Sequence, residues 1–142
     1  MNKTLIVGAA AIAMAGAAFY FTRDDTPAEI APPAEGEPLV SITVPETLSA
    51  DAMMGQRAFE ATCAACHGAN ATGKMGFGPP LVHKIYEPGH HADMSFVMAV
   101  QNGVRAHHWP FGDMPAQTGL TQADVGNVIA YVRELQRANG IE

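Results

Sequence analysis

This sequence of 142 residues is poor in cysteine and in basic side chains, and both shortages exclude whole classes of protein. Eight lysines and arginines stand against 14 aspartates and glutamates, which gives a net charge of −6. Nucleic-acid binding needs basic side chains that neutralise phosphates, and no basic stripe occurs, so we expect no nucleic-acid partner. The length leaves room for one modest domain.

The sequence also lacks the alternation of apolar and polar residues that predicts strands, and it contains no internal repeat. Helical patterns are present instead. Ser49 is a typical N-cap for a helix that we expect to extend through Ala64, and residues 94–103 predict another helix, ended by glycine. The remaining stretches are rich in glycine, proline and histidine. We therefore predict an all-α fold of three to four helices with long loops.

The clearest predicted helix covers residues 122–138, near the end of the chain. Thr121 and Asp124 resemble a capping box before it, and Gly140 is a stop signal after it. Its apolar residues recur at helical spacing and form one stripe. These residues are Val125, Val128, Ile129, Val132 and Leu135.

An apolar segment opens the chain, with 18 uncharged, mostly apolar residues from position 4 to position 21. This length favours a membrane-spanning helix over the shorter apolar core of a signal peptide, although residues 15–17 could serve as a cleavage site. Lys3 places the N-terminus in the cytoplasm. We expect residues 1–23 to be a membrane anchor or uncleaved signal in the bacterial inner membrane, with the following domain in the periplasm.

Residues 24–45 contain five prolines and five acids but no base, which predicts an extended linker. Residues 39–44 are an apolar exception within it. They could form a short strand or lie as a strip on the domain, and the simpler interpretation is a linker end that packs down. The globular domain then covers residues 46–142.

The chain has two cysteines, Cys63 and Cys66, and His67 follows them directly. A thioredoxin-like redox pair needs a strand and helix context that is missing here. A structural zinc site needs four ligands, and a second pair of thiols is absent, although His67 and a further histidine could complete one. Covalent haem attachment explains all three residues, because both sulfurs lie on one side of a helical turn and can bond the two vinyl carbons of one macrocycle.

The segment from about Ser49 to Asn139 resembles a class I cytochrome c. Besides the Cys-x-x-Cys-His motif, residues 78–81 (Gly-Pro-Pro-Leu) resemble the family's Gly-Pro-x-Leu turn. The resemblance implies the cytochrome c fold, its helices and loops wrapped around one covalently bound haem c. It further implies that the Pro79 carbonyl accepts the second N–H of His67, the axial ligand, which would fix the ring's tautomer and orientation.

The resemblance also extends to a pair of crossing helices. Gly55 and Phe59 resemble the small and aromatic residues on the family's first helix, and Val128 and Tyr131 resemble their partners on its last helix. Gly126 is a further candidate for allowing the two helices to approach closely.

The second axial ligand implied by the resemblance is Met114, in the stretch Phe-Gly-Asp-Met-Pro-Ala-Gln. His107 or His108 is the alternative, and a bis-histidine iron would have a lower potential. Trp109 and Arg105 are candidates to bond the haem propionates. Trp109 could equally be core beside the macrocycle.

Two histidine doublets, His90/His91 and His107/His108, are outside the family pattern. They are interpreted either as loop histidines bonded to backbone and water, or as a copper or other metal contact near the haem edge.

A single haem with both axial positions filled implies an electron carrier and no enzyme, and the apolar segment at residues 1–23 would tether this carrier to the membrane. The alternatives are a haem-dependent enzyme or sensor with a labile sixth ligand, or a copper-handling cytochrome. The implied partners are a quinol:cytochrome c oxidoreductase as donor and a terminal oxidase or photosynthetic reaction centre as acceptor. Residues 46–142 carry nine acids against six bases, so we expect no strong basic docking face.

Overall fold

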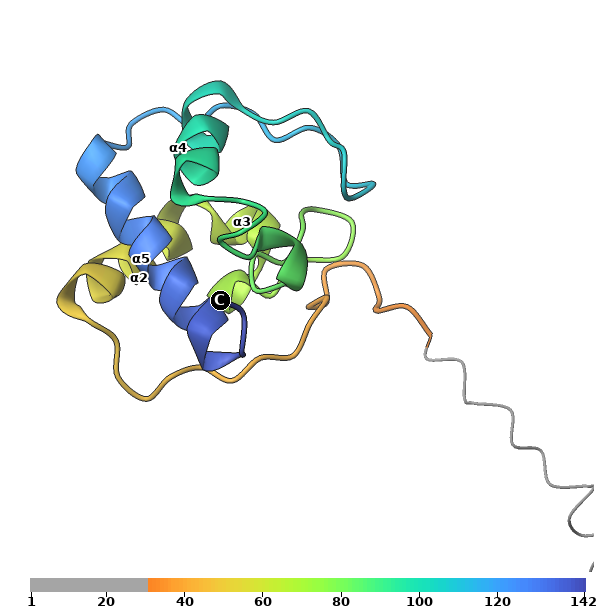
Figure 1. The fold of residues 1–142 in the computed structure, drawn as a ribbon. Coiled ribbons are helices and arrows are strands. Elements are labelled where there is room, and N and C mark those ends of the chain that lie inside the picture. The colour runs from red at the N-terminus through yellow and green to blue at the C-terminus, as the bar shows by residue number, and fades with distance from the viewer. Residues whose placement is uncertain (1–30) are drawn as a thin grey trace, which may run out of the picture. The chain divides into compact units, whose positions relative to one another are not determined.

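The computed structural model describes residues 31–142, and its compact unit spans Pro32–Glu142. Within those residues no strand forms, which confirms the prediction of an all-α fold for this part of the chain (Figure 1). The predicted membrane segment, residues 1–23, lies outside the described residues. Among the described helices, none has the length and apolar character needed to cross a membrane.

The helical elements of the described residues are α2 (Ala50–Thr62), α3 (Ala64–His67), η1 (Ala69–Ala71), η2 (Lys84–Tyr86), α4 (Asp93–Asn102) and α5 (Gln122–Ala138).

Helix α2 begins where the sequence predicts. The Ser49 side chain caps it and accepts a hydrogen bond from the backbone N–H of Ala52, at 3.2 Å. The helix ends at Thr62, two residues before the predicted end at Ala64, with Cys63 as its C-cap, and the chain then makes the separate helical turn α3. The cysteine motif therefore sits at a break between two helices.

Helix α5 has the predicted capping box and the predicted apolar stripe. Thr121 and Asp124 form the capping box, with each side chain accepting the other residue's backbone N–H. All five residues of the predicted apolar stripe are buried, which confirms the core face. Helix α4 ends at Asn102, and its C-cap Gly103 has a φ of +74°, a conformation that favours glycine.

Helices α2 and α5 cross closely (Figure 1). A Cβ atom at Gly55 would lie 1.8 Å from the backbone oxygen of Asn127, so the crossing requires glycine at this position. Phe59 and Tyr131 pack beside it, with ring centroids 5.7 Å apart. Gly126 plays no part in this approach, because a Cβ there would meet nothing within 4 Å.

The described part of the predicted linker lies against the domain. We expected the domain to begin at residue 46, whereas the compact unit begins at Pro32. The backbone N–H groups of Leu39 and Val40 donate to the Thr72 carbonyl, and Asn139 pairs with the backbone of Thr43. The backbone groups of an extended segment need partners, and here the domain supplies them.

The substitution Gly55→Ala should destabilise the protein by about 3 kcal/mol, because the added methyl meets backbone and forces the helices apart. The matched control is Gly126→Ala on α5, where open space and better helix propensity should give no loss or a gain of up to about 1 kcal/mol. Denaturant unfolding of the two variants and the parent measures both effects. Equal midpoints for the two variants would contradict the close crossing.

Candidate functional site

The Cys-x-x-Cys-His motif occupies the break between α2 and α3. The backbone N–H groups of Cys66 and His67 both donate to the Cys63 carbonyl, at 3.1 and 2.9 Å, so the motif forms one tight turn. Cys63 is half-buried and Cys66 is exposed, and the two form no disulfide with each other. The chain leaves the turn at Gly68, with φ +72°.

His67 is buried and its ring is oriented by the turn at residues 78–81. Its Nδ1 lies 2.9 Å from the carbonyl oxygen of Pro79. A carbonyl only accepts, so Nδ1 carries the proton and Nε2 keeps a free lone pair. Burial lowers the pKa of His67, and the Pro79 carbonyl opposes that shift. Gly78 makes the approach possible, since a Cβ there would lie 2.7 Å from the Cys66 carbonyl oxygen.

The Cys63 thiol is electrostatically unlike a reactive redox thiol. Burial, with a smaller contribution from Cys66, raises the pKa of Cys63 to about 11. Redox-active Cys-x-x-Cys motifs lower a cysteine pKa to stabilise the thiolate. This environment disfavours the thiolate, which argues against a thioredoxin-like pair.

An apolar cavity of about 570 Å³ lies beside the motif. Its wall joins α2, α3, α4 and the loop between α4 and α5, and its size is that of a cofactor site. Both His67 and Met114 line it. The wall includes the residues Phe59, Cys63, His67, Leu81, Trp109 and Met114.

Met114 is held in place by backbone contacts. Its N–H and carbonyl pair with the carbonyl and N–H of Val104, both at 2.9 Å, in an isolated antiparallel bridge. Gly103 packs beside this bridge, where a Cβ would lie 2.6 Å from the Met114 carbonyl oxygen. The methionine is thus presented to the cavity by a loop whose two ends are tied together.

Trp109 also lines the cavity, and its indole Nε1 is buried without a hydrogen-bond partner. Burial raises the pKa of the nearby Tyr86 to about 12, and the Trp109 N–H lies close enough to the Tyr86 hydroxyl to oppose that shift. The contact nevertheless does not have hydrogen-bond geometry. A buried donor without a partner points to an acceptor that belongs in the cavity. The cavity wall holds the Cys63 sulfur, an oriented imidazole, a thioether and a free N–H, and this set fits a haem with ionised propionates. Cys66, in the same turn as Cys63, is exposed and is not among the lining residues.

The structure does not bring every predicted residue to the cavity. Arg105 is exposed and is not among the lining residues, so its predicted contact with a propionate has no support in this geometry. His91, His107 and His108 do line the cavity, whereas His90 does not. His83, beside Trp109 with ring centroids 5.3 Å apart, is a neighbour that the sequence did not single out.

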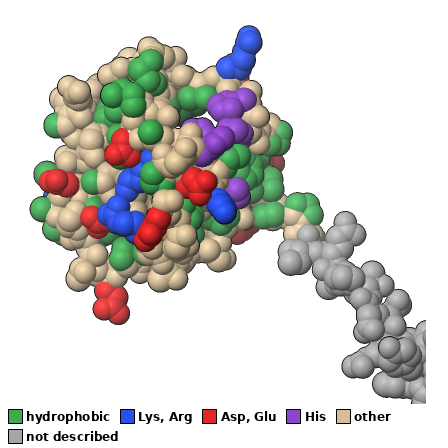
Figure 2. Space-filling view, viewed as in Figure 1, with side chains coloured by type: hydrophobic (Ala, Val, Ile, Leu, Met, Phe, Trp, Pro, Cys, Tyr) green, Lys and Arg blue, Asp and Glu red, His purple; other side chains and the backbone are tan. Residues whose placement is uncertain are grey.

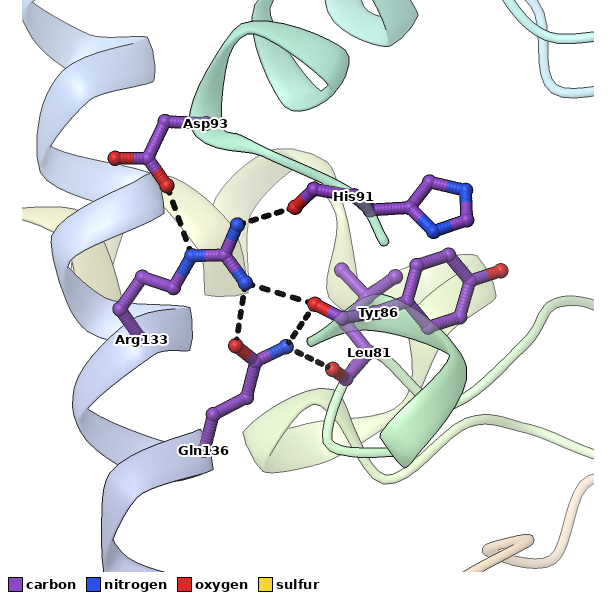
Figure 3. A network of polar contacts seen from close by, with 6 residues as sticks. All are labelled: Leu81, Tyr86, His91, Asp93, Arg133 and Gln136. Atoms are coloured by element: carbon purple, nitrogen blue, oxygen red, sulfur yellow. Dashed lines mark hydrogen bonds and ion pairs between the residues drawn. The ribbon is translucent and has the colours of Figure 1, made fainter. Parts of the chain in front are cut away.

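A buried polar network on α5 was also missed from the sequence (Figure 3). Arg133 forms an ion pair with Asp93 at 2.8 Å and donates to the carbonyls of Tyr86 and His91. Gln136 accepts from Arg133 and donates to the carbonyls of Tyr86 and Leu81. The sequence did contain a pattern that could have revealed this network. Arg133 and Gln136 each lie four residues after a residue of the apolar stripe, Ile129 and Val132, and therefore on the buried face of the helix. The network fixes the turn that carries His91.

Comparison with known proteins agrees with this geometry. The family model described as Cytochrome c matches residues 52–136. Cytochrome c-555 of Chlorobaculum thiosulfatiphilum is 39% identical over 85 residues, which cover 58% of this chain and 93% of that protein. The chain belongs to the cytochrome c family. It is a haem c protein of the electron-transferring class, with the haem bound covalently.

The substitution Arg133→Met should lower the free energy of unfolding by about 3 kcal/mol, because it removes the Arg133 donor from the His91 carbonyl and the ion-pair partner from Asp93. Arg137→Met, one turn further along α5 at an exposed position, is the matched control and should change stability by less than about 0.5 kcal/mol. Denaturant unfolding of the haem-loaded proteins measures both. If the two variants were equally stable, the network would not support the fold.

Proposed function

We propose that this protein is a single-haem electron carrier in which Cys63 and Cys66 hold the porphyrin and His67 and Met114 bind the iron. The observation that carries the proposal is that His67, oriented by Pro79, and Met114, held by Val104, line one apolar cavity. When bound there, a haem supplies a one-electron couple between ferrous and ferric iron.

The protein's own residues do three things for that couple. Pro79 accepts the Nδ1–H of His67, which leaves Nε2 as the donor atom and raises its basicity. Phe59 and Leu81 exclude water from the cavity, and low polarity around the iron tunes its potential. Met114 supplies a thioether, whose pairing with a histidine suits electron transfer. His67 and Met114 would leave a bound haem iron no open position for a substrate, so the proposed activity is outer-sphere transfer.

A haem propionate is the acceptor that we propose for the unpaired Trp109 N–H, in agreement with the resemblance to the family. Hydrogen bonds to charged groups are worth about 1.5–3 kcal/mol. Arg105, exposed and away from the cavity wall, is a weaker candidate for the same role.

We further propose that the carrier works on the periplasmic side of a bacterial inner membrane, tethered by residues 1–23. The apolar composition of that segment supports an anchor, which would confine the domain near membrane partners. The proposed donor is a quinol:cytochrome c oxidoreductase, and the proposed acceptor is a terminal oxidase or photosynthetic reaction centre. The excess of acids in residues 46–142, with Arg133 buried, favours a small and weakly charged contact.

Substituting Met114 by alanine tests the axial assignment. In haem-loaded protein, Met114→Ala should abolish the red ferric absorption band of methionine ligation and lower the midpoint potential. His107→Ala and His108→Ala are the matched controls and should keep the band. A parent protein with high-spin iron that binds peroxide would contradict the carrier and favour a haem enzyme or sensor. A band lost only on removing a histidine would reassign the ligand.

Trp109→Phe tests the propionate contact. It removes the N–H and keeps an aromatic ring, so the unfolding free energy of the haem-loaded protein should fall by about 2 kcal/mol. Losing a donor to an anion raises the anion's pKa, so the inflection in midpoint potential against pH should move to higher pH. Tyr86→Phe, which removes the neighbouring hydroxyl, is the control. An unmoved inflection would mean that Trp109 acts only in packing.

A further inference from the structure

The two histidine doublets converge in the folded domain although they are far apart in the sequence. His90 and His91 lie in the turn before α4, and His107 and His108 lie in the loop after it. His90, His91 and His108 each place one ring nitrogen so that all three nitrogens lie within 4.8 Å of one another. The His107 ring is adjacent, with its centroid 4.1 Å from that of His108. Figure 2 shows histidine side chains gathered in a patch on the surface.

Two of these imidazoles are fixed in a single tautomer by the backbone. His91 Nδ1 lies 2.6 Å from the Ile85 carbonyl oxygen, and His107 Nδ1 lies 2.8 Å from the Arg105 carbonyl oxygen. A carbonyl only accepts, so Nδ1 bears the hydrogen and Nε2 bears the lone pair in each neutral ring. This is the arrangement of metal-binding histidines, whose second nitrogen donates to a carbonyl or carboxylate.

The segments that carry the doublets are anchored to the domain. The Glu87 carbonyl accepts the N–H groups of both His90 and His91, and Arg133 donates to the His91 carbonyl (Figure 3). On the other segment, Asp113 accepts the N–H of Ala106 at 2.8 Å, directly before the second doublet. The convergence of the histidines thus rests on hydrogen bonds outside their own rings.

The chemistry of the donor set selects the kind of metal. The group of three contains only imidazole nitrogens, which suit copper, zinc and nickel rather than calcium or magnesium. Among divalent first-row ions, copper binds such a site most tightly. Nitrogens bonded to one metal at about 2.0 Å lie roughly 3–4 Å apart. Rotation of the exposed His90 and His108 rings could bring the three nitrogens to that spacing.

We propose that His90, His91 and His108, with His107 as a fourth donor, form a copper(II) site at the mouth of the haem cavity. Three of these histidines, His91, His107 and His108, also line the cavity, so the copper would lie beside the haem. A bound cation favours the ferrous state electrostatically, so copper binding raises the haem midpoint potential. The site does not depend on Met114 as axial ligand, and it adds a function to electron transfer.

The experiment titrates untagged, haem-loaded protein with copper(II), using electron paramagnetic resonance and a competing chelator. The parent protein should bind one equivalent of copper(II), and the spectrum of the bound copper should show hyperfine structure from coordinated nitrogens. The exposed double substitution of His90→Asn with His108→Asn should weaken binding at least tenfold. His83→Asn is the matched control, because it removes a histidine outside the cluster while asparagine can still cap η2. It should bind like the parent.

Two further readouts separate this proposal from the proposed function. The haem absorption spectrum reports axial ligation and the integrity of each variant, whatever happens to copper. Copper should raise the midpoint potential of the parent and of His83→Asn, and it should leave that of the double variant unchanged. Equal copper affinity in the double variant and the parent, or an absence of binding at micromolar copper, would overturn the site. Tighter binding of zinc than of copper would overturn its assignment to copper.

Discussion

The close crossing of α2 and α5 is the constraint on which the rest of the structure depends. Gly55 lets the two helices approach at Asn127, and Phe59 then packs on Tyr131 one turn later. Because α2 ends at Thr62 with Cys63 as its C-cap, the crossing also fixes where the cysteine motif begins and how His67 meets the cavity. A contact between two backbones thereby determines the position of the cofactor site.

Helix α5 connects this crossing to the histidine cluster through Arg133. The guanidinium is buried, yet each of its nitrogens has an acceptor, including the Tyr86 and His91 carbonyls. A buried charge is tolerated when its hydrogen-bonding capacity is filled in this way. One helix therefore presents an apolar face to α2 and a polar end to the turn that carries the histidines, so both proposed metal environments share one support.

A domain of this size buries too little surface for a large core of its own, and its cavity of about 570 Å³ is consistent with a cofactor completing that core. The long loops fit this interpretation, since they enclose the cavity and contribute Met114 and Trp109 to its wall. The unpaired indole N–H is the clearest sign of a missing polar partner. By contrast, the histidine cluster is polar and lies at the cavity mouth, where ions from solvent can reach it.

The sequence by itself determined the local features: the helices, Ser49 and Thr121 as caps, the buried stripe of α5 and the Cys-x-x-Cys-His motif. These follow from neighbouring residues, where spacing and capping chemistry act. Only the tertiary structure decided that Gly55 and not Gly126 meets the facing helix, that Arg133 is buried, that Arg105 stays outside the cavity, and that two distant doublets meet. Those outcomes depend on how segments pack in space, which no local pattern specifies.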